Sequence, residues 1–429
     1  MSAQVIVIGA GYGGLTTAAI LAHNGVEVEV FEATGHLGGR ASFDFKDGFI
    51  VDYGIHANRF GREGAAASAL KEINYELEFV RMGEPLLYYE GSFVKLPTAP
   101  VDFIKTKILT AADKAILIGN MVKLVAGKHQ NLADRSLESI LIGRNRKAIP
   151  EIFSILAGLC LVAPDISKTS AGEMAQFLKR AMRAKENVAY PKGGTRQIIE
   201  ALASKIEKNG HIRTGHRVKA IEIENGKVKS VLVKGEKHKA EAVVFAVPLQ
   251  RIPDFLEKGL PQDFIEKCAS IVPTAGISVD LCLSDKVSDI DGLVVTPNPL
   301  TMGQFTSNID PDVAPEGKQL ATFYYPLPVT LLDDKENAEK EEEKFLDLIE
   351  QMFPGIMEKV EWRRILTLKM VDGFEPRVGQ SAKHRPGVRA PQVENLFFAG
   401  DVVSAPGSGG DVAFFSGVEA ARQVLSYLK

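Results

Sequence analysis

The sequence feature that most constrains the fold is a glycine-rich turn near the start of the chain, between a predicted strand and a predicted helix. Residues 5–8 form a short apolar run typical of a buried parallel strand, and the alanine- and leucine-rich residues 15–23 predict a helix. Between them Gly9, Gly11 and Gly14 follow the pattern G-x-G-x-x-G. The first glycine permits a tight turn, the second lets the backbone approach a pyrophosphate, and the third lets the helix pack closely on the sheet. The positive end of the helix dipole then faces the phosphates of a bound ligand.

An acidic residue at the end of the next strand strengthens this interpretation. Residues 26–31 alternate as a second strand, and Glu32 follows it, 23 residues after Gly9. A carboxylate in this place can accept hydrogen bonds from both hydroxyls of an adenosine ribose, and it disfavours a 2′-phosphate. A lone glycine pattern can be only a structural turn. Placed between a strand and a helix, with this acid beyond, it predicts a dinucleotide-binding domain.

Two further elements favour FAD over NAD. The first is Gly38-Gly39-Arg40, which places a cation where it can reach the pyrophosphate, although a surface salt bridge is the alternative for Arg40. The second is a predicted buried strand that ends in Gly400-Asp401, so that Asp401 can reach the ribityl chain or the diphosphate. Glycines at 407–410 then open a helix over residues 411–428, whose N-terminus can stabilise the negative charge of a reduced flavin.

Length, composition and charge set outer limits. A chain of 429 residues with 45% hydrophobic and 24% charged residues suggests two or three ordinary globular domains. The net charge of −3 argues against nucleic acid as a partner. Three scattered cysteines form no metal-ligand cluster, which favours a reducing compartment and no metal site. No signal peptide is evident, and the apolar stretch 152–164 is too short to span a bilayer, so we expect a soluble, cytoplasmic protein.

The middle of the chain is less regular. Residues 84–187 read as helices and loops, with a helix start at residues 110–113. Residues 197–208 predict a helix, and residues 217–247 predict antiparallel strands with a hairpin at Asn225-Gly226 and a buried last strand. The charge-dense stretch 333–344 favours the solvated start of a helix over an interaction patch. The core face of that helix consists of Phe345, Ile349, Met352 and Phe353.

The terminal motifs, with Asp52-Tyr-Gly-Ile-His56, resemble the FAD-dependent amine oxidase and phytoene desaturase superfamily. The resemblance implies an α/β fold: a discontinuous, glutathione-reductase-like (Rossmann-type) FAD domain with an inserted α+β substrate domain. The FAD domain would comprise residues 1–83, 188–255 and 391–429, and the substrate or cap domain residues 84–187 and 256–390. It also implies that Val218 contacts the adenine through its backbone and that Gly54 and His56 lie near the flavin. The expected cofactor-binding residues are Gly9, Ala10, Gly11, Gly13, Gly14, Glu32, Ala33, Gly39, Arg40, Gly54, Ile55, His56, Val218, Ala246, Gly400, Asp401, Gly410, Asp411 and Val412.

Within the superfamily, residues 376–391 and 308–317 are similar to the phytoene dehydrogenase-like branch. This implies oxidation, desaturation or isomerisation of a hydrophobic substrate, with a polyisoprenoid or carotenoid as first choice and a quinone or oxygen as electron acceptor. No cysteine lies beyond Cys282, so we expect the FAD to be bound non-covalently. The oligomeric state stays open.

No general base is evident, because hydride transfer to a flavin depends mainly on positioning and on excluding water. His56 is the best single candidate near the ring, but the favoured interpretation is a hydrogen-bonded structural histidine. Tyr324 and Tyr325 line the substrate cavity or are ordinary strand residues, and Trp362 has the same two interpretations. Lys192 is expected at the surface.

Residues 103–125 bear on membranes. They mix apolar residues with Lys105, Lys107, Lys114 and Lys123, against the single acid Asp113. Such a helix can rest on an anionic bilayer while the enzyme extracts a lipid substrate. The favoured alternative is that it forms part of the cap over the substrate domain.

Two rival functions remain at this point. A true amine oxidase should have an aromatic pair facing the flavin and a lysine that holds a water at its N5 atom, and neither can be placed from the sequence. A prenyl-binding carrier of the same fold should have decayed FAD motifs. Here Gly9, Gly11, Gly14, Glu32, Arg40 and Asp401 are all intact, which argues against a carrier.

Overall fold

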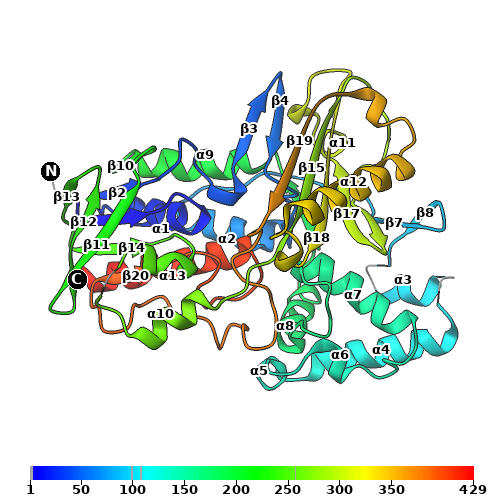
Figure 1. Cartoon of the computed structure of the whole chain (residues 1–429), viewed down its shortest axis with the longest axis horizontal. Helices are drawn as coiled ribbons and strands as arrows, with labels where there is room; N and C mark the ends of the chain where they lie inside the picture. The colour runs from blue at the N-terminus through cyan, green and yellow to red at the C-terminus, as the bar shows by residue number, and fades with distance from the viewer. Residues whose placement is uncertain (1–2, 98–99, 107–108, 257) are drawn as a thin grey trace.

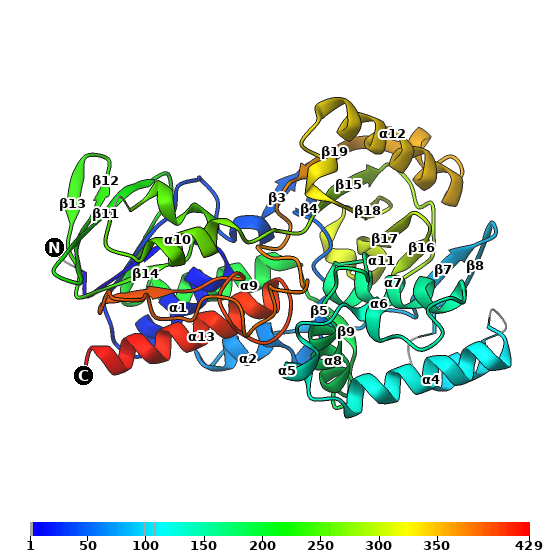
Figure 2. The same cartoon turned by 60° about the horizontal axis from the view of Figure 1, so that its bottom comes forward.

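The structure is a computed structural model that describes residues 3–97, 100–106, 109–256 and 258–429. The chain folds into two lobes. One is built on a parallel sheet that includes the first strand of the chain and is covered by its last helix, α13 (Figure 1). The other combines a larger, mostly antiparallel sheet with a group of helices, which Figure 2 shows below that sheet.

The parallel sheet gathers strands from widely separated parts of the sequence. Its order is β10-β2-β1-β14-β20, and every pairing in it is parallel. The strands are β1 (Val5–Ile8), β2 (Val28–Phe31), β10 (Gly210–Arg213), β14 (Ala242–Phe245) and β20 (Leu396–Phe398). The prediction that residues 217–247 are antiparallel throughout is therefore wrong for β14, which pairs in parallel with β1 and β20 because it is a central strand of this sheet. Its predicted burial is confirmed.

Helices pack around this sheet, and the closest packing joins the first helix to the last. They are α1 (Tyr12–His23), α2 (Ala65–Lys71), α9 (Thr195–Ile206), α10 (Gln262–Ala269) and α13 (Gly410–Tyr427). The Thr17 hydroxyl on α1 donates a hydrogen bond to the Gly417 carbonyl on α13 at 3.1 Å. A side chain at Gly417 would lie 2.8 Å from the Gly13 carbonyl oxygen, so glycine lets the two helix backbones approach.

A small antiparallel sheet lies beside the parallel one. It consists of β11 (Val218–Glu224), β12 (Lys227–Val233) and β13 (Glu236–His238). The hairpin predicted at Asn225-Gly226 is confirmed, and both residues have positive φ. Asn395, just before β20, holds this hairpin because its side-chain amide donates to Val228 O and accepts from Val228 N.

The second lobe centres on a seven-stranded sheet of order β19-β15-β18-β17-β16-β7-β8. Helix α12 (Lys335–Met352) packs on it, and the four residues predicted as the core face of that helix are all buried. The strands are β7 (Leu86–Tyr89), β8 (Ser92–Lys95), β15 (Ala275–Leu283), β16 (Val294–Pro297), β17 (Leu300–Phe305), β18 (Gln319–Leu327) and β19 (Val360–Leu368). The hairpin β7–β8 corrects the prediction that residues 84–187 hold only helices and loops.

The helices below this sheet form a cap with its own apolar core. They are α3 (Pro100–Lys105), α4 (Ala111–Ala126), α5 (His129–Leu132), α6 (Leu137–Ile140), α7 (Ala148–Leu161) and α8 (Ala171–Ala181). The helix start at residues 110–113 is confirmed, since the Thr110 hydroxyl accepts a hydrogen bond from Asp113 N. One continuous helix over residues 103–125 is wrong, because α3 ends before α4 begins. Lys107, which entered that prediction, lies outside the described residues.

Short elements join the two lobes. They are β3 (Phe43–Lys46), β4 (Phe49–Asp52), β5 (Asn58–Arg59), β6 (Phe79–Val80), β9 (Val188–Pro191) and α11 (Thr306–Ile309). In Figure 1 the β3–β4 hairpin stands beside β19, at the boundary between the lobes.

The α1–α13 contact yields a stability prediction. Gly417→Val should lower the free energy of unfolding by about 1–3 kcal/mol, because the new side chain meets the α1 backbone and Thr16. Chemical denaturation measures the change. Gly119→Ala is the control, since Gly119 lies within α4 with open space around it, and this exchange should be neutral or stabilising by up to about 1 kcal/mol. Equal stability of the two variants would contradict the close contact.

Candidate functional site

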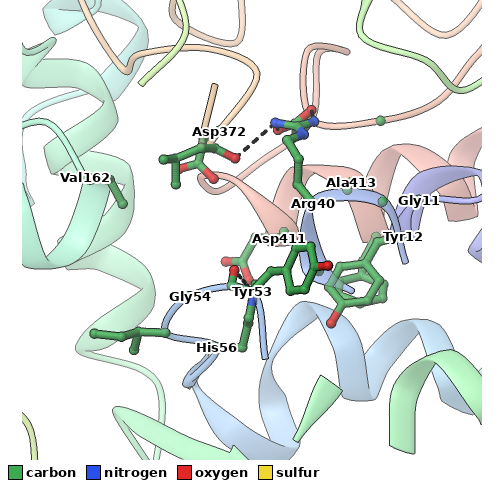
Figure 3. A pocket seen from close by; sticks show the side chains of 18 of the residues that line it. Gly11, Tyr12, Arg40, Tyr53, Gly54, His56, Val162, Asp372, Asp411 and Ala413 are labelled. Carbon is green, nitrogen blue, oxygen red and sulfur yellow. Dashed lines mark hydrogen bonds and ion pairs between the residues drawn. The ribbon is translucent and has the colours of Figure 1, made fainter. Parts of the chain in front are cut away.

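A large cavity of ≈ 910 Å³ runs between the lobes. One part of its wall consists of the carboxyl ends of the parallel strands and the loops that follow them, which is where ligands bind in sheets of this type. The other part comes from the cap and the seven-stranded sheet. Figure 3 shows the region in which Tyr12, Arg40, Asp372 and Asp411 approach the cavity.

The glycine-rich turn has the geometry that its sequence predicts. Gly9 has φ = +101°, which favours glycine, and a side chain at Gly14 would overlap the Gly9 carbonyl oxygen. Gly11 differs from both, because a side chain there would meet no atom closer than 4.0 Å and would point into free space. Both Gly11 and Gly13 line the cavity at the start of α1. The backbone is therefore open at the place where a pyrophosphate is expected.

Glu32 is held in place at the end of β2. Its Oε2 accepts a hydrogen bond from Ala10 N at 2.9 Å, and its Oε1 accepts from Thr34 N at 2.8 Å and from the Thr34 hydroxyl at 2.9 Å. The carboxylate is buried and lines the cavity. It thus presents fixed oxygens next to the glycine-rich turn, as ribose recognition requires.

Arg40 and Asp401 form an ion pair in the cavity wall. Arg40, in the short 3-10 turn Gly39–Ala41, donates from Nη1 to Asp401 Oδ2 at 2.8 Å and from Nη2 to Oδ1 at 2.7 Å. Burial opposes the charge on Arg40, but the Asp401 carboxylate raises its pKa above the usual value. The same Nη1 also donates to Val371 O, and Gly373 N donates to Asp401 Oδ2. Of the two interpretations of Arg40, a salt bridge is present, but in the cavity wall instead of on the outer surface.

The loop after β4 supplies another wall. Gly54 has φ = +100°, and a side chain there would have only the Ser278 hydroxyl, 4.0 Å away, as a neighbour. His56 Nε2 lies 3.0 Å from Tyr53 O, so this ring is hydrogen-bonded to the backbone. Asp52, before the loop, is buried, which raises its pKa, and it accepts hydrogen bonds from the hydroxyls of Tyr190 and Thr195. These contacts fix the loop.

At the start of α13 the Asp411 carboxylate faces the cavity and pairs with Arg180 of α8 at 3.1 Å. Burial raises the pKa of Asp411, while Arg59 and Arg180 act against that rise. The Arg180 guanidinium also lies over the Phe60 ring, 4.8 Å from its centroid. This ion pair ties the cap to the lobe that carries the parallel sheet.

The structure brings most of the predicted site residues to one cavity. Those that line it are Gly9, Gly11, Gly13, Glu32, Ala33, Gly39, Arg40, Gly54, Ile55, His56, Val218, Ala246, Gly400, Asp401, Gly410 and Asp411. Ala10, Gly14 and Val412 are not part of its lining. Tyr324 also lines the cavity, with its hydroxyl donating to Ala275 O, whereas Tyr325 packs on Phe345 of α12. Trp362 lies under Lys46, away from the cavity.

Sequence reasoning missed charged residues of this site, among them Arg59 and Asp372, which line the cavity, and Arg180, which pairs with the lining residue Asp411. Arg59 follows the predicted flavin loop by three residues, so its position was a usable signal. Arg180 lies on a cap helix and Asp372 follows β19, and no local motif marks either of them.

Comparison with known proteins decides the family. A family model described as flavin containing amine oxidoreductase matches residues 12–425. The chain belongs to this family. Its cofactor is FAD, and the predicted superfamily is confirmed. Among curated relatives, 4,4′-diapolycopen-4-al dehydrogenase of Metabacillus indicus is 20% identical over 95% of this chain and 94% of its own length. Phytoene desaturase of Fusarium fujikuroi is 23% identical over 98% of this chain and 89% of its own.

Solved structures confirm the predicted fold class of this flavin-containing oxidoreductase. An oxidoreductase from Methanosarcina mazei superposes with a TM-score of 0.82 at 22% identity, over 97% of this chain and 99% of that one. Putrescine oxidase bound to putrescine gives a TM-score of 0.73 at 17% identity, over 99% of both chains. At these identities the likeness shows the fold: a mixed α/β architecture around a parallel sheet.

The residues of the cavity wall can be compared with what FAD binding requires, and the helices with what crossing a membrane requires. The open backbone at Gly11, the fixed Glu32 carboxylate and the Arg40–Asp401 pair lie along one cavity, so the residues present fit this cofactor. Among the described residues, no helix combines the length and the hydropathy needed to cross a bilayer.

The open space at Gly11 allows a test of cofactor placement. Gly11→Val should fold normally, because no protein atom opposes the side chain, but it should retain less than about a tenth of the wild-type FAD, because the side chain occupies the path of the pyrophosphate. Absorbance of the supernatant after acid precipitation measures the flavin. Gly387→Val, at an exposed position with open space, should keep full occupancy. Full occupancy in Gly11→Val would mean that the pyrophosphate lies elsewhere.

Proposed function

We propose that this FAD-dependent oxidoreductase oxidises, desaturates or isomerises a hydrophobic substrate, with a polyisoprenoid or carotenoid as the first candidate. The observation that carries the proposal is the apolar part of the cavity wall. Beyond the loop at Gly54–His56, the lining consists almost wholly of hydrocarbon side chains from the cap and the larger sheet. They include Leu156, Leu159, Val162, Phe177, Leu178, Leu293, Val295, Met302, Leu368 and Met370.

The cavity wall has two parts, and we assign the cofactor to one and the substrate to the other. Residues 1–83, 188–255 and 391–429 would hold the cofactor, and residues 84–187 and 256–390 would hold the substrate. In the first group we assign the pyrophosphate to the start of α1, the adenosine ribose to Glu32, the adenine to Val218 and the flavin ring to the wall around Gly54 and His56. FAD supplies a two-electron acceptor, and a quinone or oxygen takes the electrons afterwards.

The chain itself contributes positioning and exclusion of water. The apolar wall orients a substrate that has no polar groups to recognise, and its hydrocarbon surface keeps solvent away from the reacting C–H bond. His56 remains the candidate nearest to the expected ring, and its hydrogen bond to Tyr53 O fixes its orientation. Relatives named phytoene desaturase and diapolycopenal dehydrogenase, 20–23% identical to this chain, support this substrate class.

A flavin amine oxidase is the second candidate. The carboxylates of Asp372 and Asp411 line the cavity and can attract an ammonium group. Against it, no lysine is found among the described residues of the cavity wall, although that chemistry was expected to use one. A lipid carrier without FAD remains the third alternative, which a colourless protein that cannot be reconstituted with FAD would favour.

A charge placed in the apolar wall separates these candidates. Leu159→Glu, on α7, should keep its FAD but reduce kcat/KM for a polyene about tenfold or more, because a hydrocarbon chain cannot solvate the carboxylate. Anaerobic bleaching of the flavin measures turnover. Glu151→Gln, on an exposed part of the same helix, is the control and should leave the rate unchanged. Faster bleaching of Leu159→Glu by amines than by polyenes would favour the amine oxidase.

We propose further that the cap contacts an anionic membrane while it takes up substrate. Helix α4 belongs to the cap core through Leu117 and Leu124, yet its outer face leaves Ile118 42% and Val122 62% exposed. Ile142, bonded through its backbone to Asn120 of α4, is 52% exposed. Residues 101–150 contain nine lysines and arginines against four acids, in a chain of net charge −3. Exposed apolar groups within a basic segment suit an anionic lipid surface.

Vesicle binding tests this contact. Val122→Glu should lower cosedimentation with vesicles of anionic phospholipid severalfold, since it replaces an inserting apolar group with a charge that the lipid repels. Phe45→Glu, at a 71% exposed position on β3, makes the same kind of exchange far from the cap and should bind as wild type does. Equal binding of the wild type, Val122→Glu and Phe45→Glu would contradict the membrane contact and would mean that α4 serves only in the cap.

A further inference from the structure

Asp372 lines the cavity, and the proposed oxidation of a hydrophobic substrate gives it no task. It follows β19 on the connection between the lobes, and Figure 3 shows it close to Arg40. Two hydrogen bonds with Thr274 fix its backbone. Asp372 N donates to the Thr274 hydroxyl oxygen at 2.8 Å, and Thr274 N donates to Asp372 O at 3.1 Å. The side chain therefore stands at a defined place in the wall.

One oxygen of the half-buried Asp372 side chain is buried without a hydrogen-bond partner. This atom, Oδ2, is inaccessible to solvent and has no partner among the described residues. Both oxygens lie against Gly409, where any side chain would overlap them, and Gly409 directly precedes α13. A buried carboxyl oxygen left unpaired costs about 1–3 kcal/mol. An arrangement of this kind, open to the cavity, points to a ligand or a proton as the missing partner.

The charges around Asp372 come from four elements. Together they raise the pKa of Asp372 to about 6: burial has the largest effect, Asp401 after β20 and Asp411 on α13 add to it, and Arg59 on β5 and Arg40 oppose it. Two of these neighbours are already neutralised, since Asp401 pairs with Arg40 and Asp411 pairs with Arg180. Asp372 has no such cation within 4 Å among the described residues, so it is the group whose charge is easiest to remove.

We propose that Asp372 takes up a proton from solvent when the bound flavin is reduced, and releases it when the flavin is reoxidised. The proposal rests on FAD occupying this cavity. A C–H bond of the substrate breaks, and its hydrogen and electron pair pass to the flavin, which gains one negative charge. The second hydrogen that the substrate loses leaves as a proton. Protonation of Asp372 compensates the added charge within the cavity.

The sign follows from electrostatics. In the protein itself burial raises the pKa of Asp372 to about 6, so the group is mostly ionised above pH 6. A new negative charge nearby disfavours the carboxylate and raises this pKa. Between the two pKa values the oxidised protein therefore lacks a proton that the reduced protein holds. Above the higher value and below the lower one, the protonation of Asp372 does not change on reduction.

The test is the midpoint potential of the FAD-loaded enzyme between pH 5 and 9, measured with an electrode and redox mediators so that no substrate is needed. Between the two pKa values of Asp372, from about pH 6 upward to the value in the reduced protein, the wild type should bind about one proton more per two electrons than Asp372→Asn, a slope difference of about 30 mV per pH unit. In addition, the reduced-minus-oxidised infrared spectrum should contain a protonated-carboxyl band that Asp372→Asn lacks. Identical slopes at every pH and an unchanged band would overturn the proposal.

Two variants complete the design. Glu375→Gln is the matched control, because burial raises the pKa of Glu375 as well, but this residue pairs with Arg377 and does not line the cavity; it should keep the wild-type slope. If Asp372→Asn cannot hold FAD, Arg59→Met decides. Removing the cation that lowers the pKa of Asp372 should move the region of extra proton uptake to higher pH, and an unmoved region would overturn the proposal. A wild-type protein that binds no FAD would instead refute the proposed function.

Discussion

The ion pair between Arg40 and Asp401 is the contact on which the architecture of the site depends. It joins residues 361 positions apart, and through Val371 O and Gly373 N it also fixes the connection that returns from the larger sheet. The Asp401 side chain is only 7% exposed. The Arg40 side chain is 36% exposed, so its removal would leave the buried Asp401 carboxylate without a cation, which usually costs more than the intact pair contributes. Three distant segments are thus held to one geometry at the edge of the cavity.

A second arginine performs a similar task between the lobes. Arg364 on β19 donates to Asp280 Oδ2 at 2.8 Å, to Asp44 Oδ2 at 2.6 Å and to the Asp52 carbonyl oxygen at 2.6 Å. Its guanidinium lies 4.3 Å from the centre of the Tyr53 ring. Burial raises the pKa of Asp280 to about 6, although Arg364 opposes the rise. The larger sheet is therefore fastened to the loop that forms the predicted flavin wall, so the two parts of the cavity keep their relative positions.

What the sequence predicts well is local. The turn at Gly9–Gly14 and the acid at Glu32 belong to one strand–helix–strand unit, and each has a conformation that its residue types require. The pairing of β14 was mispredicted because its partners, β1 and β20, are far away in sequence. Strand β10 was missed because Gly-His-Ile-Arg contains a single large apolar residue. The hairpin β7–β8 did carry a sequence signal, namely Glu90-Gly91 between two runs that contain aromatic residues. In the structure Glu90 and Gly91 both have positive φ, as a tight turn requires.

The charged residues in and behind the cavity wall show a different limit. Arg59, Arg180 and Asp372 come from a short strand, a cap helix and an interlobe connection, and only the tertiary fold brings them together. The sequence shows how many charged residues there are and their signs. It does not show which of them form ion pairs. Asp372 depends on Gly409 for its place, and a glycine before a helix is too common to indicate a buried carboxylate beside it.

The strand order of the parallel sheet has a consequence for how each molecule is made. During synthesis β1, β2, β10 and β14 leave the ribosome well before β20. The apolar edge of β14 therefore stays unpaired until β20 has been made. An unpaired apolar edge is prone to pair with other chains. Asp401 and α13 also arrive at the end, and without them the wall of the cavity is incomplete. The cavity that holds the cofactor is therefore completed only after β20 and α13 have been made and have joined the sheet.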